Sequence, residues 1–250
     1  MTEDRTLTLA PWPQVDFSAF GKVEEKKLSR IQQLTGSFLC RNWAMIPHVT
    51  HHDEADITEM EHRRKAWNAQ GQMTKITPVS LLIKALVVGL KEFPIFNSSL
   101  SSDGSSLVTR QYFNVGVAVD TPQGLLVPVI RDCDKKSVSQ IAAELSAISD
   151  KARSKGLSMA EMSGSCISLS SLGHIGGTGF TPIINAPDVA ILGVTRSREV
   201  PTKVHGSNEI DWRLMLPLSL SYDHRVINGA DAARFTRCVA DFLASKSLFS

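Results

Sequence analysis

The fold of this chain is decided by the stretch Leu214-Met-Leu-Pro-Leu-Ser-Leu-Ser-Tyr-Asp-His-Arg-Val-Ile-Asn-Gly229. In its first nine residues, leucine or tyrosine alternates with methionine, proline or serine, a period of two that predicts a half-buried strand. An acid, an imidazole and a guanidinium follow before the Asn-Gly turn. Because a polar group at the end of a rigid strand is held more precisely than one on a free loop, His224 is our candidate for a catalytic base.

The segments on either side of this strand alternate between helical and extended patterns. Helices are predicted over 27–45, 56–70 (opened by a capping box with Asp56 as cap), 77–93, 137–155 and from 231 onward, with a short capped turn at 158–161. Strands are predicted over 47–56, 107–112, 113–119, 125–130, 165–172, 180–185 and 189–195, with turns at 97–106, 173–179 and 205–208. Helices early and late, with strands clustered between them, predict a single mixed α+β domain.

Composition places the chain among ordinary globular proteins. Its 250 residues suffice for a sizeable core, and a net charge of +2 is too mild to indicate binding to nucleic acid or a membrane. The four cysteines are scattered without a Cys-x-x-Cys pair, which disfavours disulfide frameworks and zinc ribbons and favours a reducing cytoplasm. The longest apolar run, 79–90, is too short to span a bilayer. We therefore expect a soluble, cytoplasmic protein.

The N-terminal residues differ from the rest. Residues 1–14 mix charges, threonines and two prolines without periodicity, so we interpret them as a flexible linker remnant that precedes a domain over 15–250.

Three kinds of site are disfavoured by the residues themselves. The glycine-rich turn 173–179 has neither dinucleotide-binding nor P-loop spacing, and no helix is predicted after it. The chain contains no Gly-x-Ser-x-Gly, so a serine hydrolase lacks its nucleophile elbow. In the acidic and histidine-rich segment 48–54, His51 and His52 would point to opposite faces of a strand, so we expect no metal site.

The stretch 221–229 resembles the signature of the dihydrolipoyl acyltransferases, the E2 core enzymes of 2-oxo acid dehydrogenase complexes, which usually reads Asp-His-Arg-x-x-Asp-Gly. Further stretches resemble the same family, so that the similarity extends from about residue 14 to the C-terminus: 46–50, 117–129, 167–173 and 184–193. The sequences of residues 12–21 and of Arg41-Asn-Trp43 are most similar to the E2 enzyme of bacterial pyruvate dehydrogenase complexes, which is an acetyltransferase.

This resemblance implies a fold and an assembly. The expected fold is like that of chloramphenicol acetyltransferase, a mixed sheet flanked by helices, in a trimer whose active-site channel lies between subunits. Trimers would assemble into a larger, cubic core. The lipoyl domain, and the domains through which the E1 and E3 components bind, would lie outside this chain.

The resemblance also implies residue roles. His224 would take the proton from the thiol of coenzyme A, whose sulfur then attacks the acetyl group on dihydrolipoamide. Ser170 occupies the family's position for the hydroxyl that stabilises the oxyanion, and its neighbour Ser171 would point the other way. Asn228 replaces the usual aspartate, and since an amide neither titrates nor forms an ion pair, we expect it to position other groups. Arg64 falls where the family places a basic contact to coenzyme A.

The sequence leaves several residue roles and functional alternatives open. Asp223 and Arg225 are expected to be structural neighbours of His224. The residues do not separate an acetyltransferase from the E2 core of a 2-oxoglutarate or branched-chain complex, nor do they fix whether His224 and Ser170 come from different subunits. A non-catalytic assembly scaffold is the alternative from another class, and it would need neither residue.

Overall fold

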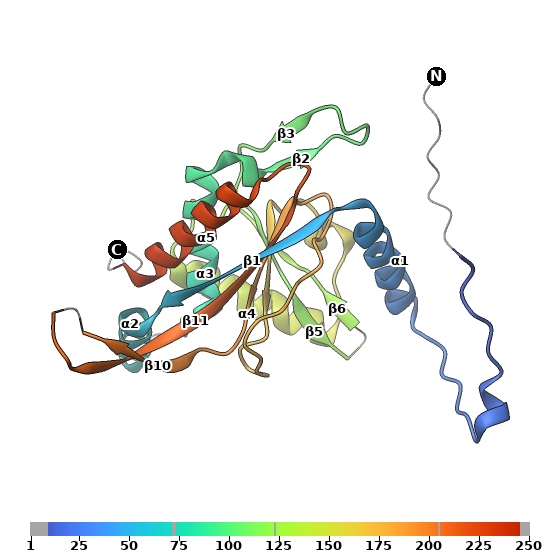
Figure 1. Cartoon of the computed structure of the whole chain (residues 1–250), viewed down its shortest axis with the longest axis horizontal. Coiled ribbons are helices and arrows are strands. Elements are labelled where there is room, and N and C mark those ends of the chain that lie inside the picture. Colours follow the sequence, from blue (N-terminus) through green and yellow to red (C-terminus); the bar gives the residue numbers. More distant parts are fainter. Residues whose placement is uncertain (1–9, 72–73, 123, 205, 246–250) are drawn as a thin grey trace.

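A computed structural model describes residues 10–71, 74–122, 124–204 and 206–245. Most of the expected N-terminal linker and His205 of the expected hairpin turn lie outside these residues. Residues 10–16 contain neither helix nor strand and lead into a short 3-10 turn, η1 (Phe17–Phe20). This N-terminal segment, blue in Figure 1, lies beside the body of the molecule rather than within it.

A mixed sheet forms the centre of the described structure. Its strands run in the order β1-β11-β9-β8-β4-β7, with β10 also paired to β11. The bounds are β1 (His48–Asp56), β4 (Val115–Val117), β7 (Val129–Ile130), β8 (Ile167–Ser171), β9 (Ala190–Val194), β10 (Arg198–Lys203) and β11 (Ile210–Asp223). The central pairs β4–β8 and β8–β9 are parallel, and the remaining pairs are antiparallel. Two small hairpins flank the sheet: β2 (Ser98–Leu100) with β3 (Leu107–Thr109), and β5 (Val119–Thr121) with β6 (Gly124–Leu126).

The longest of these strands is β11, which contains the strand predicted over 214–222. β11 pairs with β1 from Met215 to Asp223 and with β9 from Leu218 to Tyr222. Its alternating residues separate to the two faces of the sheet, as the period of two predicts. One face is apolar and belongs to the main core, whereas the other carries Ser219 and Ser221.

Four of the five α-helices in the described part of the chain begin where a capping side chain satisfies one of the first N–H groups. Ser29, Thr77 and Ser137 form capping boxes. The bounds are α1 (Arg30–Met45), α2 (Thr58–Ala69), α3 (Pro78–Glu92), α4 (Val138–Ser154) and α5 (Gly229–Ala244), with short turns η2 (Pro94–Asn97) and η3 (Met159–Met162). None of the helices in the described ranges combines the length and the apolar character needed to cross a bilayer.

The main core lies between the apolar face of the sheet and the helices α3 and α5 (Figure 1). Leu82 and Leu86 of α3, Phe235 of α5 and Leu218 of β11 are all at most 1% exposed. The close contact between the two helices depends on Gly89, where an added Cβ would lie 2.8 Å from the Phe235 ring. A rigid helix layer therefore fixes β11 and the turn that follows it.

The structure corrects several sequence predictions. The predicted strand 113–119 is divided into β4 and β5, and the predicted strand 125–130 into β6 and β7. Residues 180–185 form no strand, and Ser98–Leu100, expected in a turn, is a strand. Asp56 is not the N-cap of α2, because the helix begins after Ile57. Asp56 is instead the last residue of β1, and its carboxylate accepts from the N–H and the hydroxyl of Thr58. The helix α1 exists as predicted, but most of its apolar residues stay exposed, Ile31 is half-buried, and only Asn42 is buried. The predicted α+β class, a mixed sheet with flanking helices, is confirmed.

Candidate active site

His224 lies directly after the last residue of β11, where the chain turns into α5. Its backbone N–H donates to the carbonyl of Pro47 at 3.1 Å, which fixes the start of the turn. The side chain is exposed, and its ring centroid lies 5.6 Å from that of Tyr222. Among the described residues, the imidazole has no hydrogen-bond partner, so both ring nitrogens are available to a substrate.

Asp223 is bonded to Arg225 and not to the imidazole. The Arg225 Nη2 and the Asp223 Oδ2 are 2.6 Å apart, and the Arg225 backbone N–H donates to Asp223 Oδ1 at 3.0 Å. The hydrogen bonds that the Arg225 guanidinium donates to Asp223 raise the pKa of Arg225. Asp223 and Arg225 thus brace the turn beside His224, as expected of structural neighbours.

Asn228 caps the N-terminus of α5. Its Oδ1 accepts from the backbone N–H of Asp231 at 3.0 Å. Aspartate caps a helix about as well as asparagine. What the asparagine adds is an amide N–H₂ donor, which points to no described acceptor.

Ser170 lines a cavity of about 350 Å³ on the face of the sheet opposite the main core. Side chains from α1, β8 and residues 180–185 enclose this cavity, among them Phe38, Leu39, Ser168, Phe180 and Ile183. Within the described chain, the Ser170 hydroxyl makes no hydrogen bond, so it is free to donate to a ligand. A mostly apolar lining with a few hydroxyls, here those of Thr35, Ser168 and Ser170, suits a thioester on an alkyl arm.

The register places His224 and Ser170 far apart in one chain. Ser170 pairs with Gly193, which pairs with Ser219 of β11. His224 lies five residues beyond Ser219, so at about 3.3 Å per residue and 4.8 Å per strand the two are roughly 19 Å apart. They also lie toward opposite faces, because the His224 ring lies 5.6 Å from that of Tyr222, whose side chain faces the core, whereas Ser170 shares the face of Ser219. The two side chains of one chain therefore cannot reach the same carbonyl group.

Two side chains that the sequence analysis did not select hold the wall of the cavity. Asn42 Nδ2 donates to the carbonyl of Ile184 at 2.9 Å, and the N–H of Ile184 donates to His48 Nε2 at 3.0 Å. His48 Nδ1 lies 2.8 Å from the Ile46 carbonyl and therefore carries the proton. These bonds satisfy both polar groups of Ile184 without a neighbouring strand. The sequence contains one indication of this contact, which is that Asn42 places an amide side chain among the apolar residues on one face of the predicted helix.

Arg64 is held by its own helix and the chain after it. Its Nε and Nη2 donate to the two oxygens of Glu61, each at 2.7 Å, and Nη1 donates to the Ile76 carbonyl at 3.0 Å. This bidentate pair lowers the pKa of the Glu61 carboxyl. Two of the five N–H donors of Arg64 have no partner among the residues that the structure describes, but its charge is already paired.

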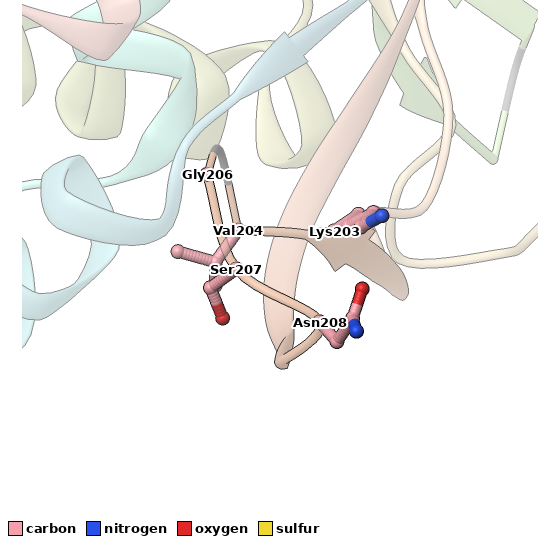
Figure 2. Close-up of a pocket in the computed structure, with 5 residues that line it drawn as sticks. All are labelled: Lys203, Val204, Gly206, Ser207 and Asn208. Carbon is pink, nitrogen blue, oxygen red and sulfur yellow. The ribbon is translucent and has the colours of Figure 1, made fainter.

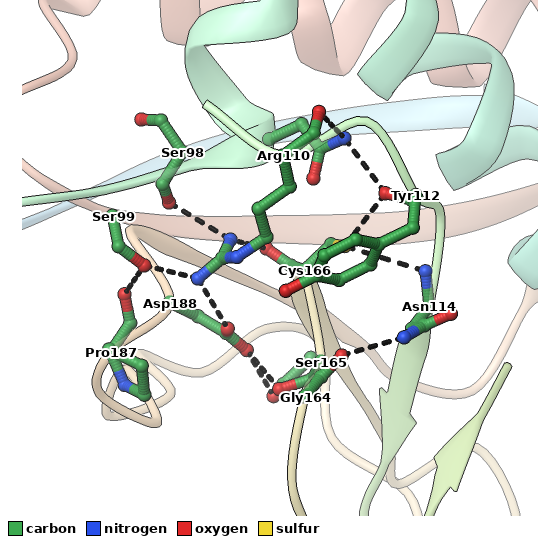
Figure 3. Close-up of polar contacts among 12 residues, drawn as sticks. Ser98, Ser99, Arg110, Tyr112, Asn114, Gly164, Ser165, Cys166, Pro187 and Asp188 are labelled. Atoms are coloured by element: carbon green, nitrogen blue, oxygen red, sulfur yellow. Dashed lines mark hydrogen bonds and ion pairs between the residues drawn. The ribbon is translucent and has the colours of Figure 1, made fainter. Parts of the chain in front are cut away.

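A buried ion pair joins Arg110 and Asp188 (Figure 3). Arg110 Nη2 and Asp188 Oδ1 are 3.7 Å apart, and both side chains are at most 7% exposed. Asp188 Oδ2 accepts from the hydroxyls of Ser165 at 2.8 Å and Ser168 at 3.1 Å. Because this ion pair is long, desolvation outweighs it and raises the pKa of Asp188 to about 6. Ser168 thereby links the buried carboxyl to the lining of the cavity.

Other hollows carry less chemistry. A hollow at the β10–β11 turn is lined by Lys203, Val204, Gly206, Ser207 and Asn208, whose side chains diverge in Figure 2. Of the residues described, no three histidine, cysteine or acidic side chains come together as a metal site would require.

Comparisons with known proteins give one consistent result. The family model for the catalytic domain of 2-oxoacid dehydrogenase acyltransferases matches residues 20–249. The dihydrolipoyllysine-residue acetyltransferase component of the pyruvate dehydrogenase complex of Cupriavidus necator is 54% identical over 240 residues, which are 95% of this chain and 43% of that protein. The chain thus spans less than half the length of this relative.

Solved structures agree. A dihydrolipoamide acetyltransferase of Azotobacter vinelandii, studied for the catalytic roles of a serine, a histidine and an asparagine, has a TM-score of 0.93 at 50% identity and covers 97% of this chain and 100% of its own. The cubic core of a pyruvate dehydrogenase multienzyme complex gives 0.93 at 51% identity with the same coverage. Chloramphenicol acetyltransferase shares the fold, with a TM-score of 0.58 at 17% identity over 82% of this chain and 94% of its own.

Proposed function

Because this chain belongs to the 2-oxoacid dehydrogenase acyltransferases, whose catalytic domain it matches over residues 20–249, we propose that it transfers an acetyl group between dihydrolipoamide and coenzyme A. The dihydrolipoamide would be carried on a lipoyl domain outside this chain. The acetyl group is proposed on the similarity to the Cupriavidus necator acetyltransferase component.

One observation carries the proposal. In the Azotobacter vinelandii enzyme, the histidine and the asparagine studied for catalysis stand four residues apart, as His224 and Asn228 do here. In this chain both side chains occupy the turn between β11 and α5, and Ser170 lines the cavity on the opposite face of the sheet. A base, an amide and a hydroxyl are thus available for acyl transfer.

His224 acts as the general base. Its ring nitrogen takes the proton from the thiol of coenzyme A while the sulfur attacks the carbonyl carbon of acetyl-dihydrolipoamide. Transfer of a proton from an ordinary thiol to an ordinary imidazole is uphill by roughly 2.7 kcal/mol, which is small enough for catalysis without a free thiolate. The intermediate then breaks its bond to the dihydrolipoamide sulfur, which receives the proton from the imidazolium.

Ser170 stabilises the intermediate. The carbonyl oxygen becomes an oxyanion when the thiol adds, and the free Ser170 hydroxyl donates to it. One preorganised donor of this kind contributes about 3 kcal/mol. Asn228 keeps the turn in place through the α5 cap, and its free amide N–H₂ positions a group at the same end of the site.

The site is completed by a second copy of the chain. We propose a homotrimer in which His224 of one subunit faces Ser170 of the next, because one chain alone keeps them roughly 19 Å apart on opposite faces. The apolar residues of η1 and α1 support this assembly, since Phe17, Phe20 and Trp43 are each more than 60% exposed in a single chain. Following the related cubic core, trimers would assemble into a larger cubic core in the cytoplasm, with E1 and E3 bound through domains outside this chain.

Arg64 is proposed as a contact to coenzyme A on family position alone. Its pairing with Glu61 argues for a weaker contact than an unpaired cation would make, because the guanidinium charge is already compensated.

His224→Ala tests the proposal. Transfer from acetyl-coenzyme A to free dihydrolipoamide is expected to fall by about 10²–10⁴-fold, as when a general base is removed, with the assembly size by light scattering unchanged. His62→Ala, which removes an exposed histidine of α2, is the matched control and should keep full activity. Near-normal transfer by the His224 variant would refute the base assignment. Wild-type preference for succinyl- or isobutyryl-coenzyme A would refute the acetyl assignment.

A further inference from the structure

The side of the cavity next to Ser170 is closed by one aromatic ring. Gly193 lies laterally beside Ser170 on β9, and the ring of Phe180 covers it. A Cβ added to Gly193 would lie 2.6 Å from Cζ and 2.7 Å from Cε1 of that ring. Gly193 is therefore the residue that lets the ring pack directly on the sheet, and no other side chain fits between them.

The ring is held from both ends of its segment. The Phe180 N–H points to the hydroxyl of Ser219 at 3.4 Å, and that hydroxyl lies 3.0 Å from His52 Nδ1. At the far end, Asn42 and His48 bind the peptide groups of Ile184. Phe180 is partly buried and lines the same cavity as Ser170. A segment bonded in this way keeps its aromatic ring at one place in the wall.

The position of the ring bounds the space beside a bound acyl group. An acyl oxygen hydrogen-bonded to the Ser170 hydroxyl lies about 2.7–2.8 Å from it, so the acyl carbon stands one bond farther away. Neighbouring strands are about 4.8 Å apart. This spacing is close to the sum of the contact distance between two carbon atoms and the length of one carbon–carbon bond. A substituent that extends from this carbon toward β9 consequently meets the Phe180 ring. The ring therefore limits the size of a substituent that points toward β9, and a branched chain extends farther in this direction than a methyl group.

We propose that Phe180, packed on Gly193, determines the acyl specificity of this site by limiting it to short, unbranched acyl groups. This inference rests on the acyl-transfer function proposed above and names the residue that selects its substrate. The ring neither exchanges a proton with the reacting groups nor stabilises their charge. Its removal therefore changes which acyl group is transferred rather than whether transfer occurs.

The test compares acyl groups in the assembled protein. Rates of transfer to free dihydrolipoamide are measured for acetyl-, propionyl- and isobutyryl-coenzyme A with the wild type, Phe180→Leu and Phe180→Ala. The ratio of isobutyryl to acetyl kcat/KM is expected to rise by about tenfold or more in Phe180→Ala, the scale of discrimination that a methylene group gives, and by less in Phe180→Leu. Phe38→Ala removes another ring from the same cavity and should leave the ratio within about twofold of wild type.

Three outcomes overturn the inference. These are an unchanged ratio in both Phe180 variants, a ratio that falls, or an equal rise in Phe38→Ala, which would assign the limit to the cavity as a whole. Phe180→Leu keeps an apolar side chain on Gly193 and guards against a variant that fails to fold, with thermal unfolding as the check. A wild type that transfers no acyl group would instead refute the proposed function, so the two failures are distinct.

Discussion

Ser170 and Ser171 differ only in the face to which each points. Ser170 lines the cavity enclosed by α1 and residues 180–185, and Ser171 lines a separate hollow that also contains Glu61 and Lys65. Alternation along β8 is the cause, because consecutive side chains of a strand face opposite sides of the sheet. A hydroxyl can stabilise an oxyanion only on the side where the acyl group binds, so the one-residue difference decides the role.

Arg64 gives a prediction at the same scale. Arg64→Ala should raise the KM for coenzyme A about two- to fivefold with the KM for dihydrolipoamide unchanged, as expected for one partly compensated charge contact. Steady-state kinetics with each substrate varied in turn measures both constants. Arg63→Ala, one residue along α2, is the matched control. Equal changes in the two KM values would remove Arg64 from the coenzyme A site.

At the scale of elements, residues 180–185 look like a strand in sequence and lie as an irregular segment in the structure. Their apolar alternation is real, because Pro182 and Ile184 are buried while Thr181 is exposed. Ile184 does not enter the sheet, because the side chains of Asn42 and His48 already satisfy its N–H and C=O groups. The segment can then cover the sheet as a wall of the cavity instead of lengthening it.

The loop that holds Asp188 gives a prediction about stability. In the unfolded chain an aspartate has a pKa near 3.9, and burial raises that of Asp188 to about 6, so between these values the folded state binds more protons than the unfolded state. This carboxyl therefore favours folding at low pH, and its contribution is lost as the pH rises from about 4 to about 6, by roughly 3 kcal/mol. Above that window Asp188 is ionised and opposes burial.

Urea unfolding of the wild type and of Asp188→Asn, measured between pH 4 and pH 7, tests this sign. The asparagine cannot titrate, so the free energy of unfolding of the wild type minus that of the variant should fall as the pH rises. Asp150→Asn, which alters an exposed aspartate of α4, should show no such trend. A difference that rises with pH would mean that the attraction to Arg110 outweighs desolvation.

At the scale of the whole molecule, a site shared between subunits predicts complementation. His224→Ala and Ser170→Ala subunits are each impaired alone. In an assembly formed from equal amounts of both, about one quarter of the interfaces unite an intact His224 with an intact Ser170, because each interface draws its two residues from different chains. We expect transfer to recover toward about a quarter of the wild-type rate on this account.

The control is a mixture of His224→Ala subunits with subunits that carry both substitutions. That mixture has no intact histidine and should stay inactive. If the two single variants also gave no recovery after mixing, with mixed assembly verified by mass, the shared site would be excluded.

The strand β11 and the helices α3, α4 and α5 could be predicted from the sequence, because periodicity and capping are local properties. The same holds for the turn that carries His224 and Asn228, since turn chemistry is also local. The short strand β2, the irregular path of 180–185 and the exposed apolar face of α1 were not predictable in this way, since each depends on residues distant in the chain.

Which residues come into contact depends on the tertiary structure. The register of β8, β9 and β11 places Ser170 and His224 on opposite faces, puts Phe180 on Gly193 and brings Asn42 and His48 to Ile184. The physical reason is that the chemistry of each side chain is a local property of the sequence. The distance between two side chains, in contrast, is fixed by strand pairing and packing across the sheet.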